Sequence, residues 1–371
     1  DEAGSVAMAK RDDVEVEVRS SVAPTRTLRV SSASRVVFPA TDTTPAITKL
    51  DLVNYSIAVG EPLYRVLRER PTTLERWPNG VHPGMQLGRG ADDGGFYQKR
   101  MIRAAPDFVD GVEITFPSGR TAREVCPTEP AVLAWCVQMG TITFHPWPVR
   151  RTGEPSSVDK PDELRIDLDP EPGTSFRDVV RVALAARDLL GEFGMTGYCK
   201  TSGGRGVHVF VRIKPDWDFV EVRHAAIAFG RALERRDKGV TTEWWKELRG
   251  ERVFVDYNQN CRDRTIASAW SPRARPGAPV STPVAWAELE QISDPRELNV
   301  STVPERLTAN GDPWKGLDDE HHPIDQLLEL WDSDPIEMNF PPDYPKMPGE
   351  PPRVQPSKKV AANWDDDGNP I

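Results

Sequence analysis

The chain has 371 residues, 38% of them hydrophobic, so it can bury a substantial core, and we expect two units or one domain with tails. No apolar run reaches the roughly 18 residues of a membrane span, and no secretory signal peptide is evident, which argues against a membrane protein. Four cysteines without a Cys-x-x-Cys pair argue against a disulfide framework or a zinc site and fit a reducing cytoplasm.

The net charge of −10 argues at first against a nucleic-acid partner, but the charge is unevenly distributed. Residues 294–371 contain 17 acidic and 7 basic residues, so the rest of the chain is neutral. Residues 197–275 contain 16 basic and 10 acidic residues. The middle of the chain is therefore locally basic, although a solvated helix face would explain a basic stretch equally well.

The first part of the chain predicts a leader followed by a mixed unit. Residues 1–24 are polar and charged, and we expect them to be a disordered leader. Residues 25–160 contain short apolar runs separated by turns, which indicates an N-terminal mixed α/β subdomain.

Residues 161–293 show the clearest order of elements. Apolar patterns predict strands at 164–169, 198–201, 207–213 and 252–257, with helices at 175–193 and 218–236. The order β-α-β-β-α-β is the split βαβ arrangement of ferredoxin-like and RNA-recognition-type folds. The predicted class is therefore α+β, with an RRM-like core in this region.

Two carboxylates mark the first of these strands. Asp167 and Asp169 are two apart in an apolar run, so they share one face of the strand. Adjacent like charges are costly unless a cation lies between them, and oxygen ligands favour Mg²⁺ or Mn²⁺. In the split fold the fourth strand lies beside the first, which would add Asp256. A bare Asp-x-Asp pair also occurs by chance.

Several polar residues downstream suit a bound triphosphate. The glycine-rich turn 202–206 leads into a strand and offers Ser202, Arg205 and His208. Lys246, Arg249 and Arg273 add cations that can bind phosphate. Taken alone, the turn could be a simple hairpin and the cations solvated surface charge.

Two aromatic stretches of the N-terminal unit combine rings with polar groups. Phe96 lies in Gly94–Arg100, where two aromatics precede two cations, a pattern typical of single-strand binding. His145 lies in the run Phe144-His145-Pro146-Trp147. In isolation, core aromatics explain both stretches better.

The last part of the chain, 294–371, is acidic and rich in proline. Residues 324–331 predict one short helix. From residue 341 onward the prolines predict an extended or disordered segment.

Three motifs together resemble a known family: Asp167-Leu168-Asp169, the run Ser202–His208, and the run Val253–Asn260. They are similar to the motifs of archaeo-eukaryotic primase (prim-pol) polymerases, and more narrowly to the polymerase domain of bacterial ligase D, over about residues 28–293. The resemblance implies a DNA-directed primase-polymerase that adds NTPs or dNTPs to a primer 3′ end. Short-gap filling in DNA repair by a cytoplasmic, nucleoid-associated enzyme is the implied role.

The resemblance also implies residue roles. Asp167, Asp169 and Asp256 would hold two metal ions, Mn²⁺ or Mg²⁺. Phe96 would stack on the incoming base, and His145 would lie near the nucleotide. Arg35 and Lys49 would bind a downstream 5′-phosphate. The remaining implied residues would contact triphosphate and sugar: Ser202, Arg205, His208, Lys246, Arg249 and Arg273.

Some features depart from the family or leave alternatives open. Glu75 stands where some relatives have a basic residue, and the sequence contains no Lys-x-Asp-Gly ligase motif. We therefore expect a stand-alone member of the actinobacterial type that works on gapped or primer-template DNA with unidentified repair proteins. The alternatives are an end-binding or end-bridging module with secondary polymerase activity and, more weakly, a hydrolytic phosphoryl transferase.

Overall fold

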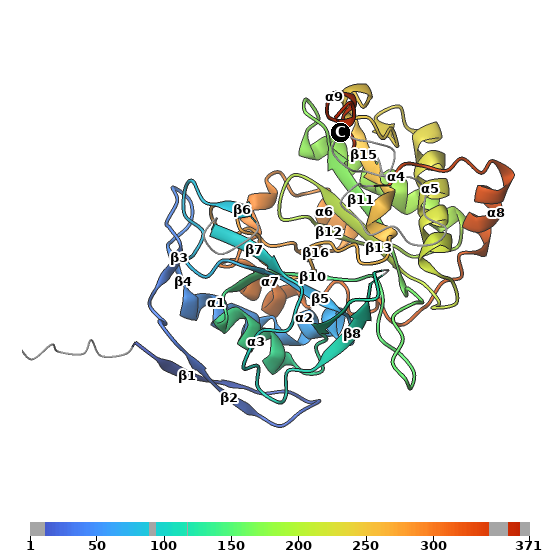
Figure 1. Cartoon of the computed structure of the whole chain (residues 1–371). Helices are drawn as coiled ribbons and strands as arrows, with labels where there is room; N and C mark the ends of the chain where they lie inside the picture. Colours follow the sequence, from blue (N-terminus) through green and yellow to red (C-terminus); the bar gives the residue numbers. More distant parts are fainter. Residues whose placement is uncertain (1–11, 89–93, 117, 341–354, 364–371) are drawn as a thin grey trace, which may run out of the picture.

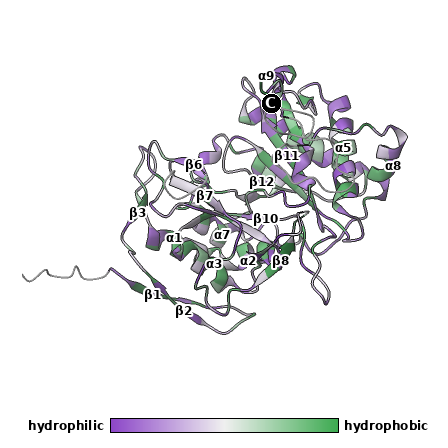
Figure 2. Cartoon of the chain, viewed as in Figure 1, coloured by the Kyte–Doolittle hydropathy of each residue, from purple (hydrophilic) through white to green (hydrophobic). Residues whose placement is uncertain are grey.

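The computed structural model describes residues 12–88, 94–116, 118–340 and 355–363. Two mixed units lie side by side: the first half of the chain, blue to green, and the second half, green to orange (Figure 1). In the described part of the chain, each unit contains a six-stranded sheet. One large hydrophobic cluster extends through both units, and Figure 2 shows green, apolar stretches in α3 and β11.

The prediction that residues 1–24 form a disordered leader is wrong for residues 14–18, which form a strand. Strand β1 (Val14–Val18) pairs with β2 (Arg26–Val30) in an antiparallel hairpin. Valine alternates with glutamate along β1, and Val18 is buried, so the segment has the period of a half-buried strand. Residues 1–11 lie outside the described part of the chain.

The N-terminal unit combines its sheet with helices and a small two-stranded sheet. Its main sheet has the order β6-β7-β5-β9-β8, and β10 also pairs with β5. The strands are β3 (Val36–Phe38), β4 (Ile47–Thr48), β5 (Thr72–Arg76), β6 (Gln86–Gly88), β7 (Gly94–Gln98), β8 (Gly111–Thr115), β9 (Thr121–Val125) and β10 (Thr141–Pro146). The helices are α1 (Lys49–Ala58), α2 (Gly60–Leu67) and α3 (Pro130–Gln138).

The second sheet has the order β14-β15-β11-β13-β12-β16. The fourth predicted strand, β15, lies beside the first, β11, as expected. All four predicted strands form near their expected limits, and neighbours among them pair antiparallel. The strands are β11 (Glu163–Pro170), β12 (Tyr198–Thr201), β13 (Val207–Arg212), β14 (Val240–Thr241), β15 (Val253–Asp256) and β16 (Pro283–Val284).

Two helices pack on the apolar face of this sheet: α4 (Phe176–Glu192) and α5 (Phe219–Arg236). Each begins at a capping box, formed by Ser175 with Asp178 and by Asp218 with Glu221, which satisfies N–H groups of the first turn. The other face of β11 carries Asp167 and Asp169 and is turned toward the N-terminal unit. The sheet therefore presents its polar residues where the two units meet.

The C-terminal region folds back onto both units. Its helices are α6 (Trp286–Leu289), α7 (Val303–Asn310), α8 (Asp325–Ser333) and α9 (Lys358–Ala361). Helix α8 confirms the helix expected at 324–331. Asp318 Oδ1 accepts hydrogen bonds from Arg212 Nε at 2.7 Å and Arg150 at 3.0 Å, which ties this region to both units. None of the described helices is long and apolar enough to cross a membrane.

The segment 355–363 lies against the second unit beside the short helix η2 (Lys246–Leu248). Lys246 N donates to Pro356 O at 2.8 Å, and Trp244 Nε1 donates to Gln355 O at 3.2 Å. Its helix α9 is four residues long, so the expectation of an extended or disordered segment is wrong for these residues. Residues 341–354 and 364–371 lie outside the described part.

Candidate active site

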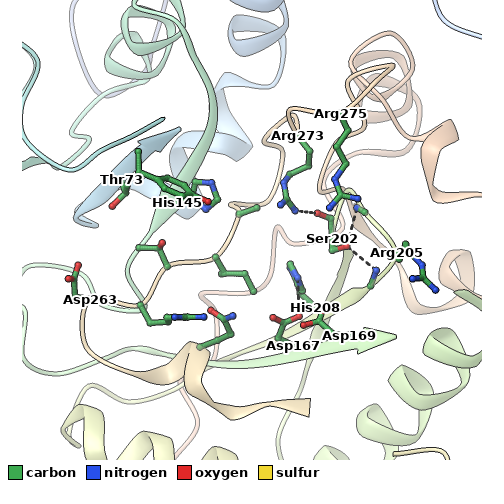
Figure 3. A pocket seen from close by; sticks show the side chains of 18 of the residues that line it. Thr73, His145, Asp167, Asp169, Ser202, Arg205, His208, Asp263, Arg273 and Arg275 are labelled. Atoms are coloured by element: carbon green, nitrogen blue, oxygen red, sulfur yellow. Dashed lines mark hydrogen bonds and ion pairs between the residues drawn. The ribbon is translucent and has the colours of Figure 1, made fainter. Parts of the chain in front are cut away.

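A cavity of about 650 Å³ lies between the polar face of the second sheet and strands β7 and β10 of the first unit. The loop 263–275 closes one side, where Ser268 N donates to Phe144 O of the other unit. Seven residues predicted from the sequence line this cavity: His145, Asp167, Asp169, Ser202, Arg205, His208 and Arg273. Figure 3 shows His208 beside Asp167 and Asp169, with Arg273 and Arg275 on the side of Ser202.

Three carboxylates form the acidic part of the site. Asp167 and Asp256 are directly opposite in β11 and β15, and one oxygen from each of Asp167, Asp169 and Asp256 lies within 4.8 Å of the others. Asp256 is held by Asn258 N and Gln259 Nε2, each at 3.0 Å. The pairing of β15 with β11 thus places a third carboxylate, Asp256, beside Asp167 and Asp169. The two-residue period of the strand already puts those two on one face.

Asp167 keeps an oxygen available for a ligand. Its Oδ1 is buried and lies 3.2 Å from His208 Nε2, but the alignment is poor and, among the described residues, it accepts no hydrogen bond. A buried carboxylate oxygen without a full partner is costly. Such an all-oxygen set fits Mg²⁺ or Mn²⁺ without distinguishing between them.

The electrostatics of the triad favour a cation. Burial, followed by the charges of Asp169 and Asp256, raises the pKa of Asp167 well above its ordinary value. Burial, Asp256 and Glu171 raise the pKa of Asp169 to about 6. The carboxylates repel one another in a site shielded from water, and a divalent ion would relieve that repulsion.

The glycine-rich turn is closed by its own serine. Ser202 Oγ accepts hydrogen bonds from Gly204 N at 3.1 Å and Gly206 N at 3.0 Å. The hydroxyl acts as acceptor in both bonds, so its own hydrogen remains for a ligand. A side chain on Gly206 would place Cβ 2.6 Å from Leu168 O, so glycine is needed to bring the turn against β11.

Two arginines are held at this turn by main-chain oxygens. Arg273 donates to Ser202 O at 2.6 Å, and Arg205 donates to Thr174 O at 3.0 Å. A guanidinium has five N–H donors, so each keeps donors for a phosphate. Burial lowers the pKa of Arg273 below its ordinary value, although an arginine in a protein stays charged.

His145 is paired with Glu75. Its Nε2 lies 3.1 Å from Glu75 Oε1, and Trp77 Nε1 donates to Glu75 Oε2 at 2.9 Å. Burial raises the pKa of Glu75, but the hydrogen bonds from His145 and Trp77 outweigh it and lower the pKa overall. Glu75, a departure from the family in the sequence, therefore holds the histidine that faces the cavity.

Tyr97, and not the predicted Phe96, lines the cavity from β7. Neighbouring residues of a strand point to opposite faces, and Phe96 instead lies under the guanidinium of Arg76 at 5.4 Å. Tyr97 meets the ring of His145 edge-on, with centroids 5.3 Å apart. The ring at the cavity thus lies one position after the expected one, because the face that this short strand turns to the site depends on the packing of the two units.

Besides Asp256, which belongs to the acidic triad, four other predicted residues do not line the cavity. Arg249 is buried and bonds to Glu171 at 2.9 Å, whereas Lys246 is exposed on η2. Arg35 is exposed and lies beside Lys49, since Lys49 N donates to Arg35 O at 2.9 Å. Lys49 is buried, its Nζ donates to Ser31 O at 2.7 Å, and burial lowers its pKa to about 8.

Sequence reasoning missed Lys200. This lysine is fully buried on β12 directly opposite His208, and its Nζ lies 2.6 Å from His208 Nδ1. A lysine in the middle of a short buried strand is the signal that could have found it, because lysine is rarely buried without a partner.

Comparison with known proteins gives one consistent result. Residues 48–314 match the family described as LigD, primase-polymerase domain. The chain is 32% identical over 303 residues to the multifunctional non-homologous end joining protein LigD of Pseudomonas aeruginosa, which covers 80% of this chain and 33% of that protein. It is 31% identical over 308 residues to the corresponding LigD of Mycobacterium tuberculosis, with 80% and 38% covered.

A solved structure agrees with these relatives. The polymerase domain of Mycobacterium tuberculosis Ligase D in complex with DNA matches with a TM-score of 0.68 and 30% identity, covering 79% of this chain and 98% of that one. The chain spans well under half the length of these curated relatives but nearly all of this domain.

Proposed function

The chain belongs to the LigD primase-polymerase family, and from that premise we propose that it is a DNA-directed nucleotidyltransferase. It extends a primer 3′ end with NTPs or dNTPs, opposite a template, and fills short gaps during DNA repair. The second sheet with α4 and α5 then serves as an RRM-like palm. The relatives are named as non-homologous end joining proteins, and the polymerase domain of one of them has been solved in complex with DNA.

The observation that carries this proposal is the acidic triad beside a cation-lined cavity. Asp167, Asp169 and Asp256 would hold two Mn²⁺ or Mg²⁺ ions. When bound, such ions would serve to activate the attacking hydroxyl and to neutralise the leaving pyrophosphate. Within that cavity Arg205, Arg273 and Ser202 provide the donors that a triphosphate requires.

The other residues take supporting roles in this proposal. Tyr97 offers a ring on which the incoming base can stack, and His145, held by Glu75, lies beside it. Lys246 and Arg249 are cations outside the cavity, and Arg249 is paired with Glu171. We assign these two to the outer phosphates or the primer strand.

The direct test is primer extension on DNA with a gap of one to a few nucleotides, with Mn²⁺ or Mg²⁺ and NTPs or dNTPs. We expect the Asp167→Ala/Asp169→Ala double variant to lose extension. An Asp216→Asn variant, which changes an exposed aspartate outside the cavity, serves as the control and should retain it. Extension by the double variant at the wild-type rate would refute the proposal.

The second candidate is an end-binding or end-bridging module with secondary polymerase activity. Arg35 favours it, because this exposed cation lies away from the cavity beside the β3–β4 hairpin, next to Lys49. The test compares affinity for gapped DNA with and without a downstream 5′-phosphate, in wild type and Arg35→Ala. Equal affinities in all four combinations would remove support for this candidate and for the gap preference.

A further inference from the structure

A short 3₁₀ helix, η3 (Tyr257–Asn260), holds the third carboxylate of the acidic triad. Asn258 N donates to one oxygen of Asp256 at 3.0 Å, and Gln259 Nε2 donates to the other at 3.0 Å. Both carboxylate oxygens are therefore directed by η3. The orientation of Asp256 depends on how η3 itself is held.

The side chain of Asn258 fastens η3 to helix α5 and to the C-terminal region. Its Oδ1 accepts from Arg223 Nε at 3.0 Å, and its Nδ2 donates to Asn339 O at 3.1 Å. A guanidinium can only donate and a carbonyl can only accept, so these partners fix the orientation of the amide. Asn258 is 1% exposed, so the loss of either partner would leave a buried polar atom unsatisfied.

Arg223 joins η3 to the C-terminal segment 337–340. This arginine lies on α5 and is 3% exposed. Its Nη2 donates to Met338 O at 2.7 Å and to Asn339 O at 3.2 Å, and its Nη1 bonds to the carboxylate of Glu337. Every nitrogen of the buried cation thus has an acceptor, and three of the four acceptors belong to the C-terminal segment.

Aromatic rings of both elements pack on the same guanidinium. The guanidinium carbon of Arg223 lies 5.3 Å from the ring centroid of Phe340 and 5.4 Å from that of Tyr257 in η3. Phe340 is fully buried. The family match ends at residue 314, so the support that reaches η3 through Arg223 comes from a part of the chain beyond that match.

We propose that Arg223 is a positioning residue through which the C-terminal segment 337–340 fixes the carboxylate of Asp256. The path runs from the carbonyl oxygens of the segment through Arg223 to Asn258, whose N–H bonds to Asp256. Without the segment, Arg223 and Asn258 would each lose acceptors in a buried place, and η3 would have to move to satisfy them. The partners of a metal-binding carboxylate set its direction and its affinity for the ion. Only this last step rests on the proposed function.

Amide hydrogen exchange, followed by NMR, tests the positioning in the metal-free protein. The N–H of Asn258 is the group that bonds to Asp256, so its exchange rate reports this contact. Arg223→Met keeps a long unbranched side chain and removes the donors. We expect it to speed exchange at Asn258 about ten-fold, as for a lost bond to a charged group, while the amides of β13 stay protected.

Arg231→Met is the matched control for this measurement. Arg231 also joins α5 to the C-terminal region, because it donates to Asp334 O at 2.8 Å and to Asp334 Oδ2 at 2.7 Å. In the described part of the chain it forms no hydrogen bond or ion pair with η3. Exchange at Asn258 should therefore stay at the wild-type rate in this control. An unchanged rate in a folded Arg223→Met protein would refute the proposal.

Affinity for Mn²⁺, measured by calorimetry without nucleotide, separates positioning from charge. Removing a positive charge near a cation site should by itself strengthen cation binding. A displaced ligand should weaken it, and we expect Arg223→Met to bind Mn²⁺ about ten-fold more weakly, with Arg231→Met unchanged. Unchanged or higher affinity in Arg223→Met would overturn the proposal. Failure of the wild type to bind Mn²⁺ would count against the proposed function, and the exchange rates would then decide the positioning alone.

Two truncations test the segment without altering α5. Removal of residues 337–371 takes away the C-terminal acceptors of Arg223, whereas removal of 341–371 leaves them in place. We expect only the first truncation to speed exchange at Asn258 and to weaken Mn²⁺ binding. Adding Arg223→Met to it should then have little further effect. Fully additive losses would show that Arg223 acts independently of the segment and would overturn the proposal.

Discussion

Asp167 and Asp256 are directly opposite each other in the antiparallel strands β11 and β15. Like charges in such a pair destabilise a sheet, and burial raises the cost. Asp169 adds a third charge from the same strand as Asp167. The fold thus holds an arrangement that is unfavourable until a cation binds, which is typical of a site built for function rather than stability.

Removing one of these charges should stabilise the metal-free protein. Since Asp169 has a pKa raised to about 6, its ionisation at neutral pH costs on the order of 1–3 kcal/mol of folding free energy. We expect Asp169→Asn to raise the unfolding temperature by a few degrees in EDTA and to abolish primer extension. Thermal unfolding with and without Mn²⁺ measures both states, with Asp216→Asn as control. A lower unfolding temperature would show that other contacts of Asp169 outweigh the repulsion between the carboxylates.

The raised pKa values also predict how metal binding depends on pH. A cation must displace the proton that Asp169 retains below about pH 6, so Mn²⁺ affinity should fall about ten-fold per pH unit below that value. The metal-free protein should change in the opposite sense. A carboxyl with a raised pKa binds its proton more tightly when folded, so this contribution to stability is greatest below its unfolded value near 4 and is lost as pH rises through about 6. Calorimetric titration of Mn²⁺ between about pH 5 and 8 tests the first effect, and metal affinity that does not change with pH would contradict it.

The two aromatics of β7 should behave differently. Tyr97 lines the cavity, so Tyr97→Ala should raise KM for the incoming nucleotide several-fold through the lost stacking surface. Phe96→Ala is the matched control, because Phe96 packs on Arg76 and should mainly affect stability. Steady-state extension kinetics with one nucleotide at a time measures the difference. A larger KM effect in Phe96→Ala would restore the assignment expected from the sequence.

The C-terminal segment 355–363 should influence η2. Besides the main-chain bonds of 355–356, Ser357 Oγ and Lys358 N both bond to Glu247, so the segment holds the loop that carries Lys246. Deleting residues 355–371 should therefore raise KM for the nucleotide, with little loss of global stability. Deletion of 364–371 alone is the control, since it leaves these contacts in place. Identical kinetics in the two deletions would rule out a role for the segment in nucleotide binding.

Much of the second unit could be predicted from the sequence because its signals are local. Alternating valines define β13, serine and aspartate caps begin α4 and α5, and the two-residue period places Asp167 and Asp169 on one face. The approach of Asp256 followed from the β-α-β-β-α-β order and was confirmed by the strand register. The same local pattern is present in β1, where valine alternates with glutamate.

Which residues face the cavity could be seen only in the folded molecule. The two-residue period of a strand predicts that Phe96 and Tyr97 point to opposite faces. The packing of the two units determines which of these faces is turned toward the cavity. Lys200 and Glu75 acquire their roles only through partners on another strand, His208 and His145. Local sequence pattern was sufficient for the carboxylate pair and the elements that carry it. The ring at the cavity and the lysine behind His208 depend on contacts between segments, which no local pattern encodes.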